Sequence, residues 1–156
     1  MSDAIAIREA DAADRAFLFD LAPRLYNVPR PSWHTLDAMM QFQNRFMAST
    51  LEPAAPNSLT LIASDPGDRA LGYVHLQTSR DGITDEVCGY IAIIAVIEEA
   101  EGTGVARRLI VEAQEWARRQ GYRFLSLDVF ADNKRAVNFY TREGFEAESI
   151  RMVKPL

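Results

Sequence analysis

The chain has 156 residues, of which 48% are hydrophobic and 25% charged, and this size and composition suit a single globular domain spanning residues 1–156. Its formal net charge of −5 argues against nucleic acid as the main partner. A single cysteine, Cys88, excludes an internal disulfide framework and a cysteine-based metal cluster, and we expect no metal site. No apolar run reaches the ~18 residues of a membrane span, and the N-terminus lacks a signal layout, so we expect a cytoplasmic protein without a membrane partner.

The N-terminal part of the chain predicts a strand and then a helix. Alternation around Ile5 and Ile7 indicates a short first strand. Asp11 is a suitable N-cap for a helix over residues 12–22. The prolines between residues 23 and 31 argue against any regular element in that segment.

The next part predicts a second helix and an antiparallel hairpin. Ser32 can cap a helix over residues 33–51, where apolar residues recur every three or four positions. Two apolar runs, 59–63 and 71–76, are separated by a short turn-rich segment, and strands joined so closely pair antiparallel. The polar segment 78–86 is expected to be a loop.

A continuous apolar run followed by a glycine-rich turn lies at the centre of the chain. Residues 90–96 suit a strand buried on both faces. Gly102 and Gly104 follow, and from Val105 onward apolar residues recur at helical spacing, with Thr103 as a candidate N-cap. Backbone N–H groups at such a helix start lack intrahelical partners and favour an anion, of which a diphosphate is a common biological example.

Two nucleotide-binding motifs fit this turn poorly. A P-loop requires Lys and then Ser or Thr after its last glycine, whereas Gly104 is followed by Val105 and Ala106. The dinucleotide fingerprint requires a third glycine at the position of Arg107, and no parallel repeat of the unit precedes it.

A second strand and helix follow the central unit. Gly121 is suited to end the central helix. A strand over 124–129 should then lie parallel to the 90–96 strand, because a helix connects the two.

One more helix carries polar side chains along a single face. Asn133, Ala136 and Tyr140 stand three and seven residues apart, which brings an amide and a phenol to the same side. Gly144 should close this helix, and a last strand is expected over residues 145–153.

Two motifs in this half of the chain resemble those of the GNAT N-acyltransferase superfamily. The superfamily's acyl-CoA motif is matched by Gly102, Gly104, Val105, Ala106 and Leu109. A second motif, an Asn followed by Ala, Phe-Tyr and Gly-Phe at fixed spacing, is matched by Asn133, Ala136, Phe139, Tyr140, Gly144 and Phe145. The chain departs from the first motif at Glu101, where Gln or Arg is usual, and at Glu98, where proline is common.

The resemblance implies an α+β fold of three layers. A mixed, mostly antiparallel sheet with a splayed parallel pair is expected at its centre, flanked by helices. The implied activity is transfer of an acetyl group from acetyl-CoA to a primary amine, on a small molecule or a peptide, by direct attack in a ternary complex. A homodimer is left open. In the superfamily the first two helices wall the acceptor site, so the candidates for lining it are Trp33, His34, Phe42 and Phe46.

The resemblance also assigns residues to the cofactor. The end of the central strand, Ile94, Ala95 and Val96, would pair with the pantetheine amides through its backbone after a bulge. Asn133 would hydrogen-bond the pantetheine arm or a water beside it. The diphosphate would lie on the glycine-rich turn, formed by Glu101, Gly102, Thr103, Gly104, Val105, Ala106 and Arg107.

Tyr140 occupies the position of the superfamily's general acid, where its hydroxyl would protonate the departing thiolate and contact the cofactor. The general base is left open between Glu86, Tyr90 and Asp128, or a water relay. Glu86 and Tyr90 are four residues apart in an extended run, which places them on one face of a strand.

Two further functions compete with the enzyme. A non-catalytic acyl-CoA-binding regulatory protein on the same fold would bind coenzyme A without turnover, although the presence of Tyr140 disfavours it. A nucleotide-binding βα module would bind NAD or ATP more tightly than coenzyme A. The residues do not separate small amines, amino acids and peptides as acceptors.

Overall fold

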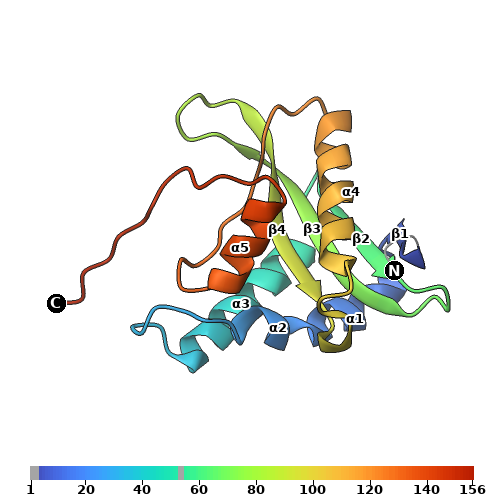
Figure 1. The fold of residues 1–156 in the computed structure, drawn as a ribbon, viewed down its shortest axis with the longest axis horizontal. Coiled ribbons are helices and arrows are strands. Elements are labelled where there is room, and N and C mark those ends of the chain that lie inside the picture. The colour runs from blue at the N-terminus through green and yellow to red at the C-terminus, as the bar shows by residue number, and fades with distance from the viewer. Residues whose placement is uncertain (1–3, 53–54) are drawn as a thin grey trace.

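The computed structural model describes residues 4–52 and 55–156, and the strands in these ranges form one five-stranded sheet (Figure 1). The strands lie side by side in chain order, and neighbours are antiparallel except for the last pair, which is parallel. The strands are β1 (Ala6–Glu9), β2 (Leu59–Ser64), β3 (Ala70–Arg80), β4 (Val87–Val96) and β5 (Leu125–Ser126). The expected mixed, mostly antiparallel sheet is confirmed.

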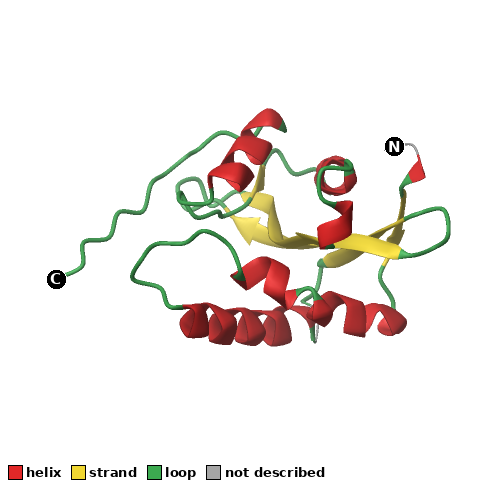
Figure 2. Cartoon of the chain, turned by 60° about the horizontal axis from the view of Figure 1, so that its bottom comes forward, coloured by secondary structure: helices red, strands yellow, loops and turns green. Residues whose placement is uncertain are grey.

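Helices cover both faces of this sheet (Figure 2). One face carries α1 (Arg15–Asp20), α2 (Ala22–Tyr26) and α3 (Leu36–Leu51), and the other carries α4 (Val105–Arg119) and α5 (Lys134–Arg142). Two 3-10 helices, η2 (Ala12–Asp14) and η3 (Glu98–Ala100), precede α1 and α4. Among the described residues, no helix combines the length and the apolarity needed to cross a bilayer.

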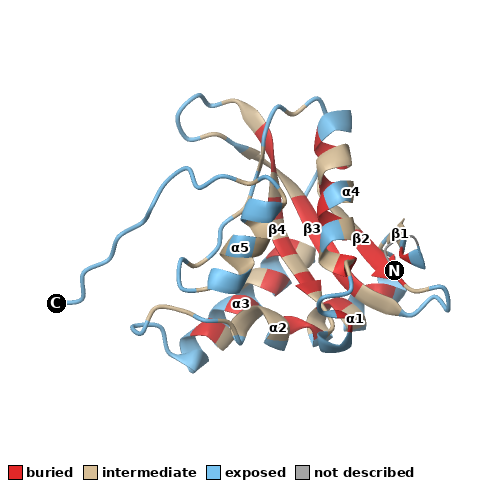
Figure 3. Cartoon of the chain, viewed as in Figure 1, coloured by how far each residue is buried: buried red, intermediate tan, exposed pale blue. Residues whose placement is uncertain are grey.

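Each face of the sheet has its own apolar core, and the buried residues follow the sheet and the inner side of α4 (Figure 3). Leu109 and Trp116 of α4 pack on β2, β3 and β4, while Met47 of α3 packs against Tyr73 on the opposite face. A Cβ at Gly89 would meet the Trp116 ring at 3.0 Å, so this glycine allows α4 to lie close to β4. This close packing holds the last turns of α4 against the start of β4.

A bulge in β4 opens the edge that faces β5. The pairing of β3 with β4 shifts register between His75 and Leu76, whose partners are Ile93 and Ile91. The parallel ladder to β5 consists of two residue pairs and extends no further along β4 than Tyr90. Within the described ranges, the β5-facing edge of β4 beyond Tyr90 is therefore without a strand partner, as expected for a bulge that splays two strands.

The first helical region differs from its predicted boundaries. The predicted helix over 12–22 is divided into η2, α1 and α2, and Pro23 lies in the first turn of α2, where its missing N–H costs nothing. The segment 23–31, predicted to be irregular, is therefore helical up to Tyr26. The α3 helix begins at Leu36 rather than at residue 33, because Thr35 and not Ser32 accepts the capping hydrogen bond from Ala38 N.

The strands also differ from the predictions at three places. β3 continues to Arg80, so the expected loop over 78–86 is reduced to the turn between β3 and β4. The predicted strand over 124–129 is a strand only at Leu125–Ser126. The predicted last strand over 145–153 is wrong: no described strand pairs with this segment, and beyond Phe145, which packs on Tyr140, it extends away from the body of the molecule as an exposed tail (Figure 1).

The fully buried His75 makes stability depend on pH. Burial lowers the pKa of its imidazole to about 4, and its Nδ1 lies 2.7 Å from the hydroxyl of Thr60. In the unfolded chain the imidazole takes up a proton near its ordinary pKa, so protonation favours unfolding. We expect the free energy of unfolding to fall between about pH 6.5 and pH 4, by at most about 1.4 kcal/mol per pH unit.

Thermal denaturation across this pH range tests the expectation in wild type and in His75→Gln. The variant should lose stability less steeply, because glutamine does not titrate and all carboxylates are shared by the two proteins. Equal slopes would show that His75 takes up no proton on unfolding.

Candidate functional site

The turn between β4 and α4 offers several unused backbone donors. Gly102 and Gly104 adopt φ angles of 74° and 92°, in the left-handed region that favours glycine. The amides of Glu101 and Thr103 donate to Glu98 O and Ala100 O, at 3.1 and 3.2 Å. In the part of the chain that the structure describes, this leaves five amides of the turn and first helical turn without a backbone acceptor: Gly102, Gly104, Val105, Ala106 and Arg107.

The cap of α4 differs from the prediction in a way that favours a ligand. Gly104 is the N-cap, and no side chain caps the helix. Thr103, predicted to cap it, instead donates its hydroxyl to Ala100 O. The helix start therefore keeps its exposed donors and the positive end of its dipole, which together attract an anion. Arg107 is exposed and faces Glu143, with its Nε 3.7 Å from that carboxylate.

The end of β4 has a strand partner on one side only, among the described residues. Ile94, Ala95 and Val96 pair with β3, and the β5-facing edge is open beyond the bulge. The carbonyl oxygen of Val96 accepts a hydrogen bond from Arg24 Nε at 3.0 Å. This geometry can accept an extended ligand along the free edge of β4, in the manner of an added strand.

The α5 helix carries the two polar residues predicted for the site. Asn133 is its N-cap, and its side chain accepts a 3.4 Å hydrogen bond from Ala136 N. Tyr140 is half-buried, with its ring edge-to-face against Phe139 and Phe145. Burial raises the pKa of the Tyr140 phenol to about 12, which keeps it protonated at neutral pH.

The Tyr140 hydroxyl remains available to a ligand. Across residues 4–52 and 55–156, the one fully enclosed side-chain polar atom without a partner is the hydroxyl of Tyr73, and no hydrogen bond engages that of Tyr140. The phenol is thus a donor beside the core of the α4 face, on the same side of the sheet as the start of α4.

The three candidate bases lie beside β5 in different states. Glu86 precedes β4 and makes a two-fold ion pair with Arg123, at 2.9 and 3.0 Å, which lowers the pKa of its carboxyl. Tyr90 donates its hydroxyl to Asp128 Oδ2 at 2.7 Å, and desolvation first, then Asp128, raises the pKa of its phenol. Glu86 and Tyr90 thus each pair with their own partner on the chain around β5.

Glu101 receives two arginines that the sequence analysis missed. Arg24 of α2 and Arg135 of α5 both contact Oε1 of Glu101, at 2.8 and 2.9 Å. A carboxylate at this position of an anion-binding turn requires a cationic partner, so Glu101 itself was the sequence signal that such a partner exists. The partners themselves could not be identified, because Arg24 lay in a segment predicted to be irregular.

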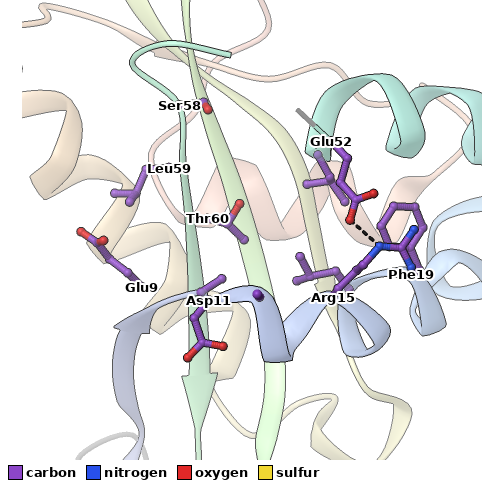
Figure 4. A pocket seen from close by; sticks show the side chains of 12 residues that line it. Glu9, Asp11, Arg15, Phe19, Glu52, Ser58, Leu59 and Thr60 are labelled. Carbon is purple, nitrogen blue, oxygen red and sulfur yellow. Dashed lines mark hydrogen bonds and ion pairs between the residues drawn. The ribbon is translucent and has the colours of Figure 1, made fainter. Parts of the chain in front are cut away.

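Two surface cavities lie on the fold, and the second reaches the turn before α4. Figure 4 shows the first, between the end of β1, α1 and the end of α3, with an ion pair from Arg15 to Glu52 at its side. The second lies beside the β2–β3 turn and includes Thr103 and Val105. Neither cavity is lined by Asn133 or Tyr140. We therefore define the candidate site by the open edge of β4, the unused amides before α4 and the polar side chains of α5.

The connection before α3 contacts the segment after β5. His34 stacks at a tilt on Phe130, with ring centroids 5.9 Å apart, and Trp33 is half-exposed beside it. Phe42 and Phe46 stack on each other along α3, and Phe42 is exposed. His34 therefore joins the α2–α3 connection to the segment after β5.

Comparison with protein families identifies the fold. A family model described as the acetyltransferase (GNAT) family matches residues 20–145, which include both motifs. The chain belongs to the GNAT family.

Individual relatives cover part of the chain. Mycothiol acetyltransferase of Jonesia denitrificans is 31% identical over 115 residues, or 73% of this chain and 35% of its own length. N-alpha-acetyltransferase 30 of Schizosaccharomyces pombe is 35% identical over 57 residues, or 36% of this chain and 38% of its own length. The chain thus spans little more than a third of these relatives.

Solved structures agree with the GNAT fold. A putative acetyl transferase from Pyrococcus furiosus superposes with a TM-score of 0.74 at 22% identity, covering 97% of this chain and 99% of the other. The aminoglycoside acetyltransferase AAC(6')-Iy, bound to a bisubstrate analogue of CoA and acetylneamine, has a TM-score of 0.69 at 19% identity and covers 97% and 98%. At these identities the likeness supports the GNAT fold and leaves the acceptor open.

Proposed function

We propose that this protein is an N-acetyltransferase that transfers the acetyl group of acetyl-CoA to a primary amine by direct attack in a ternary complex. Membership in the GNAT family supports this proposal, and the observation that carries it is the set of unused donors on one face of the sheet. The start of α4 supplies backbone amides, and α5 supplies the free hydroxyl of Tyr140.

The residues present fit acyl-CoA. The amides of Gly102, Gly104, Val105 and Ala106 suit a diphosphate, because they point from a helix start without a side-chain cap. The β5-facing edge of β4 from Ile94 to Val96 suits the pantetheine amides through the backbone groups that Arg24 does not occupy at Val96. Asn133 already caps α5, so its amide nitrogen is the group left to contact the pantetheine arm.

Tyr140 is the proposed general acid. When bound, acetyl-CoA supplies the thioester that the amine attacks. The Tyr140 phenol holds its proton at neutral pH, and its hydroxyl can donate that proton to the departing sulfur. The phenol is held by Phe139 and Phe145, which orient the hydroxyl without engaging it.

Asp128 is the proposed proton acceptor, through Tyr90 or a water. It is the candidate carboxylate that contacts a phenol instead of an arginine, and it is exposed, so a proton can pass from it to solvent. Glu86 is neutralised by Arg123 and is a weaker base, because the ion pair favours its charged form.

Replacing Asp128 by Asn should lower kcat/KM for the amine about fivefold, because Tyr90 loses its charged acceptor. Glu86→Gln is the matched control and should change kcat/KM less than about twofold. Steady-state kinetics against amine concentration, over a range of pH, measures both effects. A larger loss in Glu86→Gln than in Asp128→Asn would reverse the assignment.

The function itself is tested with the purified protein, acetyl-CoA and a pool of small amines, amino acids and peptides. Mass spectrometry should detect acetylated amine together with release of free thiol. Calorimetric binding of CoA without acetylation of any amine would support a non-catalytic acyl-CoA-binding protein instead. Tighter binding of NAD or ATP than of CoA would contradict both.

A further inference from the structure

Three charged side chains meet at the entrance to the anion-binding turn. Oε1 of Glu101 contacts Arg24 Nη2 at 2.8 Å and Arg135 Nη1 at 2.9 Å. Arg24 and then Arg135 lower the pKa of the Glu101 carboxyl. The three side chains carry a net charge of +1 beside Gly102.

The cluster joins both helical layers to the turn. Arg24 projects from α2, on one face of the sheet, and its Nε also binds Val96 O at the end of β4. Arg135 projects from the first turn of α5, on the other face. The shared carboxylate therefore holds two guanidinium groups at one point, between the open edge of β4 and the start of α4.

Charge balance explains why the chain needs this arrangement. An isolated carboxylate beside the turn would repel a diphosphate, and the amides alone would have to overcome that repulsion. Each guanidinium has five N–H donors, of which the structure uses two in Arg24 and one in Arg135. The side chains of Arg24 and Arg135 are 32% and 73% exposed, so their remaining donors are within reach of a ligand.

We propose that Arg24 and Arg135, positioned by Glu101, are the cationic ligands of the acyl-CoA diphosphate, in place of the Gln or Arg side chain usual at the position of Glu101. This inference rests on the proposed function and adds residues from α2 and α5 to its phosphate site. Glu101 is a positioning residue, and the arginines make the ligand contacts. Arg107, which was expected at the cofactor, faces Glu143.

Arg135→Gln tests the proposal, because the side chain is exposed and its loss should leave the fold intact. The variant should raise the KM for acetyl-CoA about tenfold and change kcat little, since charge-assisted hydrogen bonds to phosphate are lost equally in the ground and transition states. The truncated donor S-acetylpantetheine has no phosphate. The loss in kcat/KM on going from wild type to Arg135→Gln should therefore be at least about fivefold smaller with S-acetylpantetheine than with acetyl-CoA. Arg142→Gln, in the last turn of the same helix, is the control for charge on α5.

A series of charge-removing substitutions tests the role of Glu101. Arg24→Gln/Arg135→Gln should weaken CoA binding about 20-fold by calorimetry, because Glu101 is left without a counter-charge. Adding Glu101→Gln to this double variant should recover about fivefold, and the recovery should shrink at high salt. Recovery would show that the charge of Glu101 is felt at the phosphate site and is offset there by the two arginines, whereas a cluster remote from the phosphate would give none.

The outcomes separate this inference from the proposed function. If wild type binds CoA and transfers acetyl groups, but Arg135→Gln affects acetyl-CoA and S-acetylpantetheine equally, the arginines are not phosphate ligands and only this inference fails. If wild type neither binds CoA nor acetylates any amine, the proposed function fails first. Recovery of binding on addition of Glu101→Gln would support the inference, and its absence would overturn the role of Glu101.

Discussion

Replacing Tyr140 by Phe should lower kcat for acetyl transfer about 100-fold, while the KM for acetyl-CoA changes less than about threefold. The substitution removes one hydroxyl and keeps the ring that packs between Phe139 and Phe145, so the helix and its core contacts should persist. The loss is expected in kcat because the proton is needed as the sulfur departs. Steady-state kinetics with varied acetyl-CoA and a saturating amine measures both constants.

Tyr122→Phe is the matched control. Its hydroxyl lies 2.6 Å from Thr78 Oγ1 and its ring packs on Trp116, outside the candidate site, so kcat should stay near the wild-type value. The raised pKa of Tyr140 adds a second readout. Deprotonation of its phenol should not lower the wild-type kcat below about pH 11. Equal kcat in wild type and Tyr140→Phe would remove Tyr140 from the role of general acid.

Replacing Gly104 by Val should weaken CoA binding about 50-fold. At a φ of 92°, a β-branched residue is strained, and relief of that strain turns the following amides away from the ligand. Gly104 is also the N-cap of α4, so the orientation of Val105 and Ala106 N–H depends directly on its backbone. Isothermal titration with CoA measures the loss.

Gly121→Val separates strain from function. Gly121 follows the other end of α4 with a φ of 78°, and a Cβ there would meet no atom within 4 Å. Both variants should therefore lose about 1–2 kcal/mol of stability, measured by chemical denaturation. Only Gly104→Val should lose affinity. Comparable loss of CoA binding in both would mean that the turn acts through global stability and not through its amides.

The sheet could be predicted to the extent that its signals are local. Alternation and turn residues predict the β2–β3 hairpin, and the helix between β4 and β5 makes that pair parallel. The last strand could not be predicted correctly, because a strand over 145–153 requires a partner edge, and partners are set by tertiary structure. The division of the first helix likewise depends on packing against β4, which no local signal shows.

The candidate site divides in the same way. The turn and α5 follow from glycine spacing and helical periodicity, and their conformations agree with that reading: Gly102 and Gly104 are left-handed, and Asn133 starts a helix. The pairs that join distant segments could not be predicted, among them Tyr90 with Asp128 and Arg24 with Glu101. Their separations of 38 and 77 residues carry no periodic signal.

A crystal structure of the protein with coenzyme A would show whether the backbone amides at the start of α4 bind a diphosphate while Tyr140 faces the sulfur. We expect diphosphate oxygens within about 3 Å of the amides of Gly104, Val105 and Ala106, and the thiol within about 3.5 Å of the Tyr140 hydroxyl. A diphosphate bound away from this turn, or a thiol on the far side of the sheet from α5, would contradict this expectation.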